Sequence, residues 1–228
     1  LARKREMLRR KRELEWGNAS ASQRHVDEQG NNWTYVIVDD HFARVTGCIP
    51  ATDTLEIPAE LGGLPVLAIG PDACARLDDI TLIVCPDTVE AVGSCAFREC
   101  PNLRSVILPP KVAEFSASWL SHCHALEELV LPGMLETLES AVFDNGCLKR
   151  LHIGPWVRTV VPGAFEKTQI RELVLDEVNS HLKSDGTALY SADGSVLIAL
   201  CRPVRHYDIL NGCQKVAKKA FCNMAALE

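Results

Sequence analysis

Residues 80–103 read ITLIVCPDTVEAVGSCAFRECPNL, and this pattern returns with substitutions along most of the chain. Its large apolar residue, Phe97, belongs to a column that recurs at steps of 23, 23, 23 and 22 residues. The members of this column, the spine, are Cys74, Phe97, Leu120, Phe143 and Phe165, and Phe221 continues it after an interruption. A fixed period of about 20 to 50 residues is the signature of a repeat solenoid.

Four more apolar columns keep step with the spine. They are Ile69, Val92, Phe115, Leu138, Val160 and Val216; Val66, Val89, Val112, Leu135 and Val157; Ile83, Val106, Leu129, Leu151 and Leu173; and Cys85, Leu108, Leu131, Ile153 and Leu175. Because no single coil buries its own apolar edge, stacking against neighbouring coils must bury it. Loss of one spine residue, as in Phe143→Ala, is therefore expected to lower the free energy of unfolding by ~3–5 kcal/mol.

Each coil contains a short alternating segment, such as 103–108 (LRSVIL) and 126–131 (LEELVL). Alternation places two apolar side chains on one face, as in a strand. Pro86, Pro109 and Pro132 follow the last inward residue and end these strands, because proline has no N–H. The sequence predicts a repeat solenoid of α/β type, mostly β: a right-handed coil with short parallel strands on its concave face.

These coils resemble the BspA-like leucine-rich repeats of bacterial proteins, whose pattern runs roughly L-x-x-V-x-L-P-x-x-V-x-x-I-G-x-x-A-F-x-x-C-x-x-L. Residues 80–103 match this pattern almost throughout. The match continues through 103–126 and 157–175, and 216–227 (VAKKAFCNMAAL) add another turn. The resemblance covers about residues 50–228 and implies a binding protein, often at a cell surface, without indicating the ligand.

The array is expected to carry a charged arm, a cap and an insertion. The expected divisions are a charged helical arm and linker at 1–23, a capping hairpin at 24–50, leucine-rich repeats at 51–178, an inserted hairpin at 179–210 and a final repeat turn at 211–228. The capping hairpin turns at Asp39-Asp40, and Asp193-Gly194 is a typical hairpin turn in the insertion. No C-terminal cap is visible, and the sequence does not decide whether the array continues past Glu228.

The composition of the chain argues against several classes of function. The net charge of −6 argues against a general nucleic-acid binder, and no apolar run reaches the ~18 residues of a membrane span. The ten cysteines form no C-x-x-C pair, and several fall on buried columns, so we predict reduced thiols. Reduced thiols favour a reducing compartment such as the cytoplasm. The chain starts at Leu1, and an upstream signal would place it at the cell surface or outside.

Three features suggest other chemistry. His122-Cys123-His124 fits a metal site or a Cys–His pair, but the repeat register turns Cys123 into the core and both histidines outward. Asp185, Asp193 and Gly194 lack calcium-loop spacing and are typical of turns. The basic residues of 2–16 fit either a nucleic-acid or membrane contact or a solvated helix. We expect no enzyme, no metal and no cofactor.

The outward side chains of the strands form columns on the concave face. An apolar column stands beside charges that alternate in sign, and a contiguous exposed apolar surface usually marks a contact site. The alternative is a structural stripe, because strands favour β-branched residues and opposite charges pair across strands. The candidate partner-binding residues are Val84, Ile107, Val130, His152 and Val174, with Glu128, Arg150 and Glu172 beside them.

The leading hypothesis is a non-catalytic protein–protein interaction module whose concave strand face meets a protein partner. The alternatives are a surface adhesin-like ectodomain of a bacterium, a structural spacer in a larger protein, and a metal-dependent enzyme at His122, Cys123 and His124. The sequence indicates neither the identity of the partner nor the oligomeric state.

Overall fold

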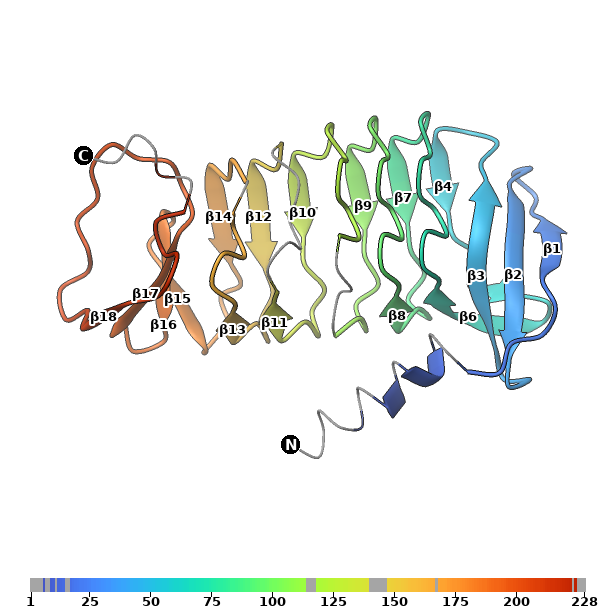
Figure 1. The fold of residues 1–228 in the computed structure, drawn as a ribbon, viewed down its shortest axis with the longest axis horizontal. Coiled ribbons are helices and arrows are strands. Elements are labelled where there is room, and N and C mark those ends of the chain that lie inside the picture. The colour runs from blue at the N-terminus through green and yellow to red at the C-terminus, as the bar shows by residue number, and fades with distance from the viewer. Residues whose placement is uncertain are drawn as a thin grey trace.

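The computed structural model describes residues 6, 9–10, 12–14, 17–113, 118–139, 147–166, 168–222 and 224. The coils stack side by side into one elongated solenoid (Figure 1). Its strands confirm the predicted mostly β repeat solenoid, and among the described residues helix occurs only in the N-terminal arm. Phe115 and Phe143, two members of the predicted columns, lie outside the described residues.

One strand from each coil builds a face that we call the strand face. These strands pair in parallel within two three-stranded sheets. The first sheet contains β4 (Thr54–Glu56), β7 (Leu82–Val84) and β9 (Ser105–Ile107), and the second contains β10 (Glu128–Val130), β12 (Arg150–Ile153) and β14 (Glu172–Leu175). The register follows the repeat, so equivalent residues of successive coils lie beside one another.

The opposite side of the solenoid is built from a second, shorter leg of each coil. Here β6 (Leu64–Ile69) pairs in parallel with β8 (Ala91–Val92), and β11 (Thr137–Leu138) pairs in parallel with β13 (Thr159–Val160). The core fills the space between the two legs and the turn that follows. The spine residues Phe97, Leu120 and Phe165 are at most 5% exposed, so the stack buries what no coil buries alone.

The boundary between the two sheets coincides with a coil of unusual composition. Trp119 stands at the coil position that Ala73, Ala96 and Ala164 occupy elsewhere. Its ring is fully buried and meets the Phe97 ring edge-on, with the centroids 6.3 Å apart. An indole in place of a methyl group adds a large volume between stacked coils, and close-packed interiors tolerate such additions only by local adjustment.

The turns place particular residues in left-handed backbone geometry. Positive φ angles recur two residues before the spine, at Asp72, Cys95, Ser118, Gly163 and Lys219, and two residues after it, at Arg76, Glu99 and His122. A side chain with a Cβ is disfavoured in this region, whereas glycine adopts it freely. Only one of these eight positions holds glycine, so the sequence gives almost no sign of this geometry.

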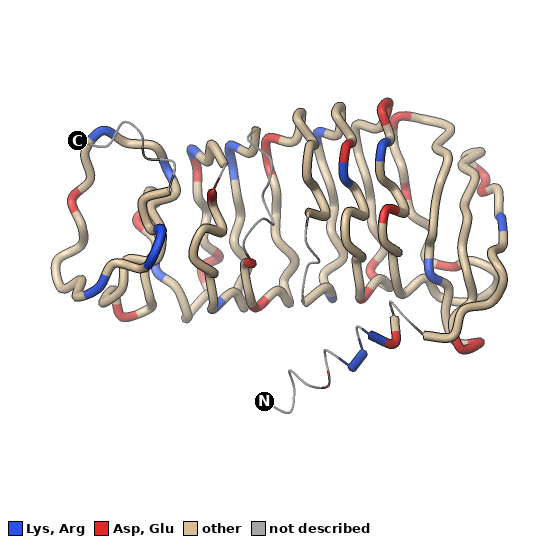
Figure 2. The backbone as a smooth tube through the Cα atoms, in the orientation of Figure 1, with Lys and Arg blue, Asp and Glu red and all other residues tan. Residues whose placement is uncertain are grey.

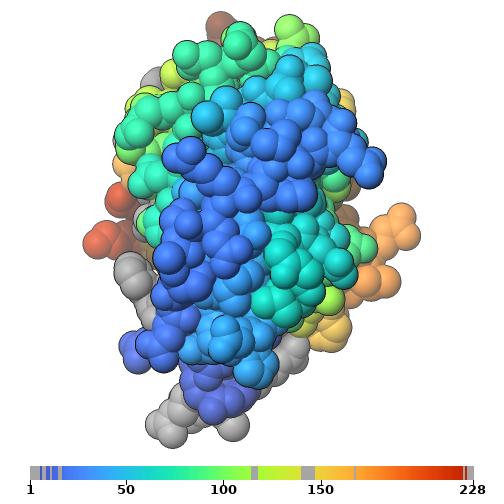
Figure 3. Space-filling model, turned by 90° about the vertical axis from the view of Figure 1, so that its right-hand side faces the viewer, coloured from blue at the N-terminus to red at the C-terminus, as the bar shows by residue number. Residues whose placement is uncertain are grey.

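The N-terminal end of the solenoid is covered by an antiparallel sheet. It contains β1 (Gln23–Val26), β2 (Asn32–Val38) and β3 (Phe42–Ile49), and β3 pairs in parallel with β6, which in turn pairs with β5 (Glu60–Leu61). The chain turns between β2 and β3 at Asp39 and Asp40, both with positive φ. Figure 3 shows these segments spread over the end of the stack, where they cover ladder groups and apolar surface.

The segment before this sheet is attached to it. Residues 17–23 have the composition of a linker, yet Ser20 N donates a hydrogen bond of 2.7 Å to Ile37 O. Upstream, the described residues of 6–14 are helical, and Leu14 is 1% exposed in a cluster with Val38 and Phe42. Arg10 Nε lies 3.1 Å from Glu90 Oε2 on the body of the solenoid. The arm is therefore docked by its C-terminal part.

The C-terminal region inserts an antiparallel meander and then resumes coiling. Its strands are β15 (Leu182–Ser184), β16 (Ala188–Ser191), β17 (Val196–Leu200) and β18 (Lys215–Val216). β17 pairs in parallel with β18. Leu200 N donates to Ala220 O, just as Phe97 N donates to Trp119 O in a regular turn. β17 therefore takes the place of the second leg of a coil.

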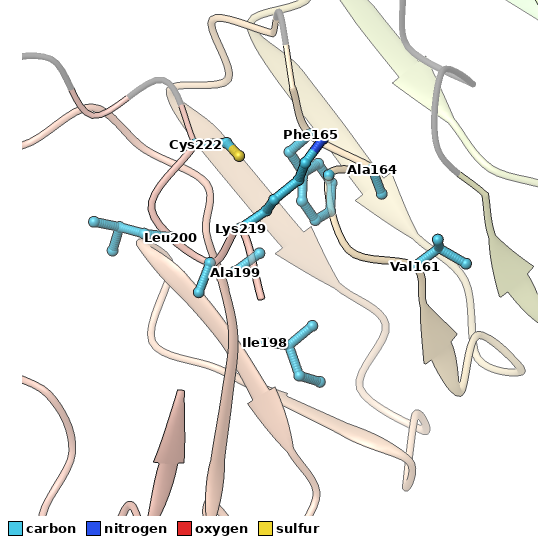
Figure 4. A pocket seen from close by; sticks show the side chains of 10 residues that line it. Val161, Ala164, Phe165, Ile198, Ala199, Leu200, Lys219 and Cys222 are labelled. Atoms are coloured by element: carbon cyan, nitrogen blue, oxygen red, sulfur yellow. The ribbon is translucent and has the colours of Figure 1, made fainter. Parts of the chain in front are cut away.

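A small cavity marks the junction between the regular coils and this region. Phe165 and Val161 on one side and Ile198, Leu200 and Lys219 on the other surround it (Figure 4). Its volume of about 10 Å³ matches a single water molecule. The Lys219 ammonium reaches across the junction to Glu166, at 2.7 Å, so an ion pair also links the two coils.

The left-handed turn positions predict a specific pattern of stability. Cys95 has a φ of 56°, and valine is the type of residue that tolerates this geometry least. Cys95→Val should lower the free energy of unfolding by about 1–3 kcal/mol, whereas Cys95→Gly should leave it unchanged or raise it. Denaturant unfolding followed by circular dichroism measures both. Equal destabilisation by the two variants would show that the thiol, and not the backbone, matters at this position.

Candidate functional site

The candidate residues of the apolar column lie in register on the strand face. Val84 pairs beside Ile107, and Val130, His152 and Val174 follow one another across the second sheet. We call these five residues the strand-face column. Ile107 and Val130 are 53% and 56% exposed, and the other three are partly buried. The two most exposed members stand on β9 and β10, on either side of the boundary between the sheets.

The three charged candidates form a ladder beside this column. Glu128, Arg150 and Glu172 are direct neighbours on β10, β12 and β14. Arg150 Nε lies 2.8 Å from Glu172, and Arg150 Nη1 lies 3.1 Å from Glu128. The hydrogen bond to Glu172, together with the charges of both carboxylates, raises the pKa of Arg150. Both carboxylates of the ladder therefore have an ion-pair partner within the chain, although one arginine serves the two of them.

A second pair of opposite charges lies beside the first ladder, and the remaining charged residues are dispersed over the surface. Lys149 pairs with Glu127, and the hydrogen bond from this lysine lowers the pKa of Glu127. His152 Nε2 lies 3.1 Å from Glu128 Oε1, which connects the apolar column to the ladder. Figure 2 shows basic and acidic residues interspersed along the solenoid and not gathered by sign. The strand face is therefore mixed, with no field of a single sign.

Sequence reasoning missed a groove at the carboxyl ends of the second sheet. It has a volume of about 550 Å³, and its lining includes Val130, His152 and Val174. Gly133, Gly154 and Pro155 also line it, as do Asp176, Glu177 and Val178, which follow β14. Three of the five strand-face column residues therefore line a groove.

The repeat register contains two signals for this groove. The position of Pro86, Pro109 and Pro132 is taken by Gly154 and then Asp176, so the last two coils have no proline ring at this position. Three residues after the last inward residue of each strand, the same register places a second apolar column, namely Met134, Trp156 and Val178. We call these three residues the rim column. All are exposed, and Trp156 and Val178 are 56% and 75% exposed.

The histidine–cysteine cluster is split by the turn, as its register predicts. Cys123 is fully buried and its Sγ donates to Phe97 O at 3.1 Å, whereas His122 and His124 are exposed with ring centroids 6.0 Å apart. Contact with the Cys100 thiol and burial raise the pKa of Cys123, so the sulfur stays protonated. Among the described residues, no group of three or more His, Cys, Asp or Glu side chains is arranged to hold a metal ion.

The aspartates of the inserted meander act as turn residues. Hydrogen bonds from Ser191 and Ser195 lower the pKa of Asp193 to about 2. Asp185 accepts backbone N–H groups of Thr187 and Ala188 and the hydroxyl of Tyr207. Side-chain oxygens that bond the backbone two residues further on are typical of aspartate turns. All ten cysteines lie among the described residues, and no disulfide joins any two of them.

The stacked coils and the exposed strand face define a leucine-rich repeat solenoid. A model of the BspA type leucine rich repeat region matches residues 68–187 in six copies. This match covers more than half of the chain, and the chain therefore belongs to the BspA-type leucine-rich repeat proteins. A search of curated proteins gave no significant match.

Solved bacterial structures share the fold at low sequence identity. The pneumococcal vaccine antigen PcpA is 16% identical with a TM-score of 0.65, over 90% of this chain and 63% of that one. A leucine-rich repeat protein from Eubacterium ventriosum is 18% identical with a TM-score of 0.61, over 89% and 57%. The Treponema pallidum protein TpLRR is 22% identical with a TM-score of 0.57, over 62% and 67%. The chain thus spans less than two thirds of the PcpA and Eubacterium chains.

No helix among the described residues is long and apolar enough to cross a membrane.

The ladder predicts a charge effect on stability that depends on salt. Arg150→Glu places three carboxylates in a row on adjacent strands, and like charges directly opposite are destabilising. The melting temperature should fall by a few degrees at low ionic strength and recover in part in high salt, because these groups are exposed and screened. Arg150→Met, which removes the positive charge without adding a negative one, should have a smaller effect. Equal melting temperatures for the two variants in low salt would contradict the ladder.

Proposed function

We propose that this chain is a non-catalytic protein-interaction module that presents its strand face to a protein partner. The observation that carries the proposal is the exposure of Ile107 and Val130, each more than half accessible in the middle of the face. Burying apolar surface is the main favourable term in protein association, and exposed contiguous apolar surface marks contact sites on soluble proteins.

The alternative, that these residues only stabilise the strands, explains their exposure less well. A residue that serves the fold contributes by removing its apolar surface from water. The inward neighbours Val106 and Leu129 do so, with 6% and 2% exposed. Ile107 and Val130 leave most of theirs in water, so the fold gains little from their apolar character. A surface of apolar and charged side chains on a rigid array suits a binding role, because repeat scaffolds offer extended faces.

The experiment is affinity capture with the full chain and a double variant, Ile107→Glu with Val130→Glu. Baits are exposed separately to cell lysate, to secreted material and to host-surface material. We expect a partner captured by the wild type to be lost with the double variant, because two carboxylates would have to be buried in the interface. Circular dichroism and thermal melting verify that the variant is folded.

The matched control substitutes two exposed apolar residues outside the strand face. Val26→Glu with Ile49→Glu adds the same charge to the N-terminal sheet, where these residues are 59% and 68% exposed. Capture should survive in this control. Equal capture by the folded strand-face variant and the wild type would remove the strand face as the binding site.

A further inference from the structure

We propose that the groove beside β10, β12 and β14 binds an extended peptide segment of the partner that carries alternate apolar side chains and a lysine or arginine at its β14 end. This inference rests on the proposed function, because it takes the partner to be a protein. It adds a location within the strand face, a backbone conformation and a charge for the bound segment.

The apolar part of the segment is indicated by the apolar residues in and next to the groove. Val130, Val174 and Val178 line it, and Val178 also belongs to the rim column. Trp156 follows the lining residue Pro155 directly and is 56% exposed, which is unusual for an indole in a chain whose Trp33 and Trp119 are almost fully buried. Tryptophan is enriched among the residues that contribute most to binding at protein interfaces.

The extended conformation follows from the dimensions. The groove crosses three coils, and strands in a sheet lie ~4.8 Å apart, so it runs about 10 Å along the solenoid axis. An extended chain rises ~3.3 Å per residue, so about three residues span this length. Alternate side chains of such a segment point to the same side. Two apolar side chains therefore enter the groove while the residue between them faces solvent.

The charge of the segment is indicated by carboxylates that the fold leaves without cations. Asp176 and Glu177 line the β14 end, and neither has a lysine, arginine or histidine within ion-pair distance among the described residues. Nearby Glu128 and Glu172, by contrast, share Arg150. The lining residues include no lysine or arginine. A basic side chain on the ligand would complement this end and orient the segment.

The Asp176 carboxylate also permits a clean substitution. Its Oδ1 accepts the backbone N–H of Val178 at 3.0 Å, and the amide oxygen of asparagine can accept the same hydrogen bond. Asp176→Asn with Glu177→Gln therefore removes both charges while keeping the turn. Asp87 occupies the coil position of Glu177 four coils earlier, after β7 and outside the groove lining, and it is exposed. Asp87→Asn is the matched control.

The test uses a phage-displayed library of random heptapeptides selected on the full chain. We expect enriched peptides to share two apolar residues separated by one position, with a lysine or arginine next to them. Synthetic copies should lose about 2- to 5-fold in affinity on Asp176→Asn with Glu177→Gln, the range expected for an exposed ion pair. Trp156→Ala should weaken them at least as much, and Asp87→Asn should have no effect. Fluorescence anisotropy measures each affinity.

The outcomes separate this inference from the proposed function. Absence of enrichment, enrichment of acidic peptides, or affinities insensitive to the groove variants would overturn the groove. The strand face would still stand if its partner were lost with Ile107→Glu and Val130→Glu but retained by the groove variants. A partner indifferent to both the strand-face variant and the groove variants would remove the proposed function, and peptides that still bound the groove would then identify a peptide site unrelated to that partner.

Discussion

Contact between successive coils is the constraint on which the rest of this molecule depends. A single coil has two short legs and one turn, which is too little to enclose its own apolar residues. Stacking solves this only if every coil places the same positions toward its neighbours, and hence the spacing of 22 or 23 residues is kept. Phe97, Leu120 and Phe165 are buried because another coil lies on either side of them. Because the coils stack in register, exposed residues at equivalent positions are aligned as well. The packing that stabilises the stack therefore also produces an extended surface.

The ends and the insertion obey the same constraint by different means. At the N-terminus, β3 joins the second-leg ladder through β6, so an antiparallel sheet closes a parallel stack. At the C-terminal side, β17 belongs to a meander and yet supplies the ladder that β18 needs. Both solutions keep backbone N–H and C=O groups paired where the repeat is interrupted, since unpaired buried groups are costly. A segment without the repeat sequence can therefore take the place of a coil where its backbone forms the same hydrogen-bonded strand pairs.

The sequence was sufficient to predict the repeat, the strand registers and the positions of Glu128, Arg150 and Glu172, because periodic apolar residues fix which residues lie side by side. It was insufficient for the features that depend on volume and backbone angles. The left-handed turns use residues as different as Asp72, Cys95 and Lys219, so no residue type signals them. The sheet boundary near Trp119 and the docking of Leu14 reflect how side chains fit in three dimensions. Whether the strand-face column binds a partner is not decided by its register.

The groove arises where the repeat departs from its own pattern. Regular coils end each strand with a proline, and the coils of β12 and β14 replace it with Gly154 and Asp176. Neither change is needed for stacking, since both coils keep their buried residues, such as Leu151 and Leu173. The same two coils expose Trp156 and Val178 and leave the carboxylates of Asp176 and Glu177 without a described cation. In a repeat protein, the pattern of buried core residues is explained by the stability of the stack. Residues that depart from the repeat in burial and in charge at one place are therefore the basis of the proposal that this groove binds a peptide.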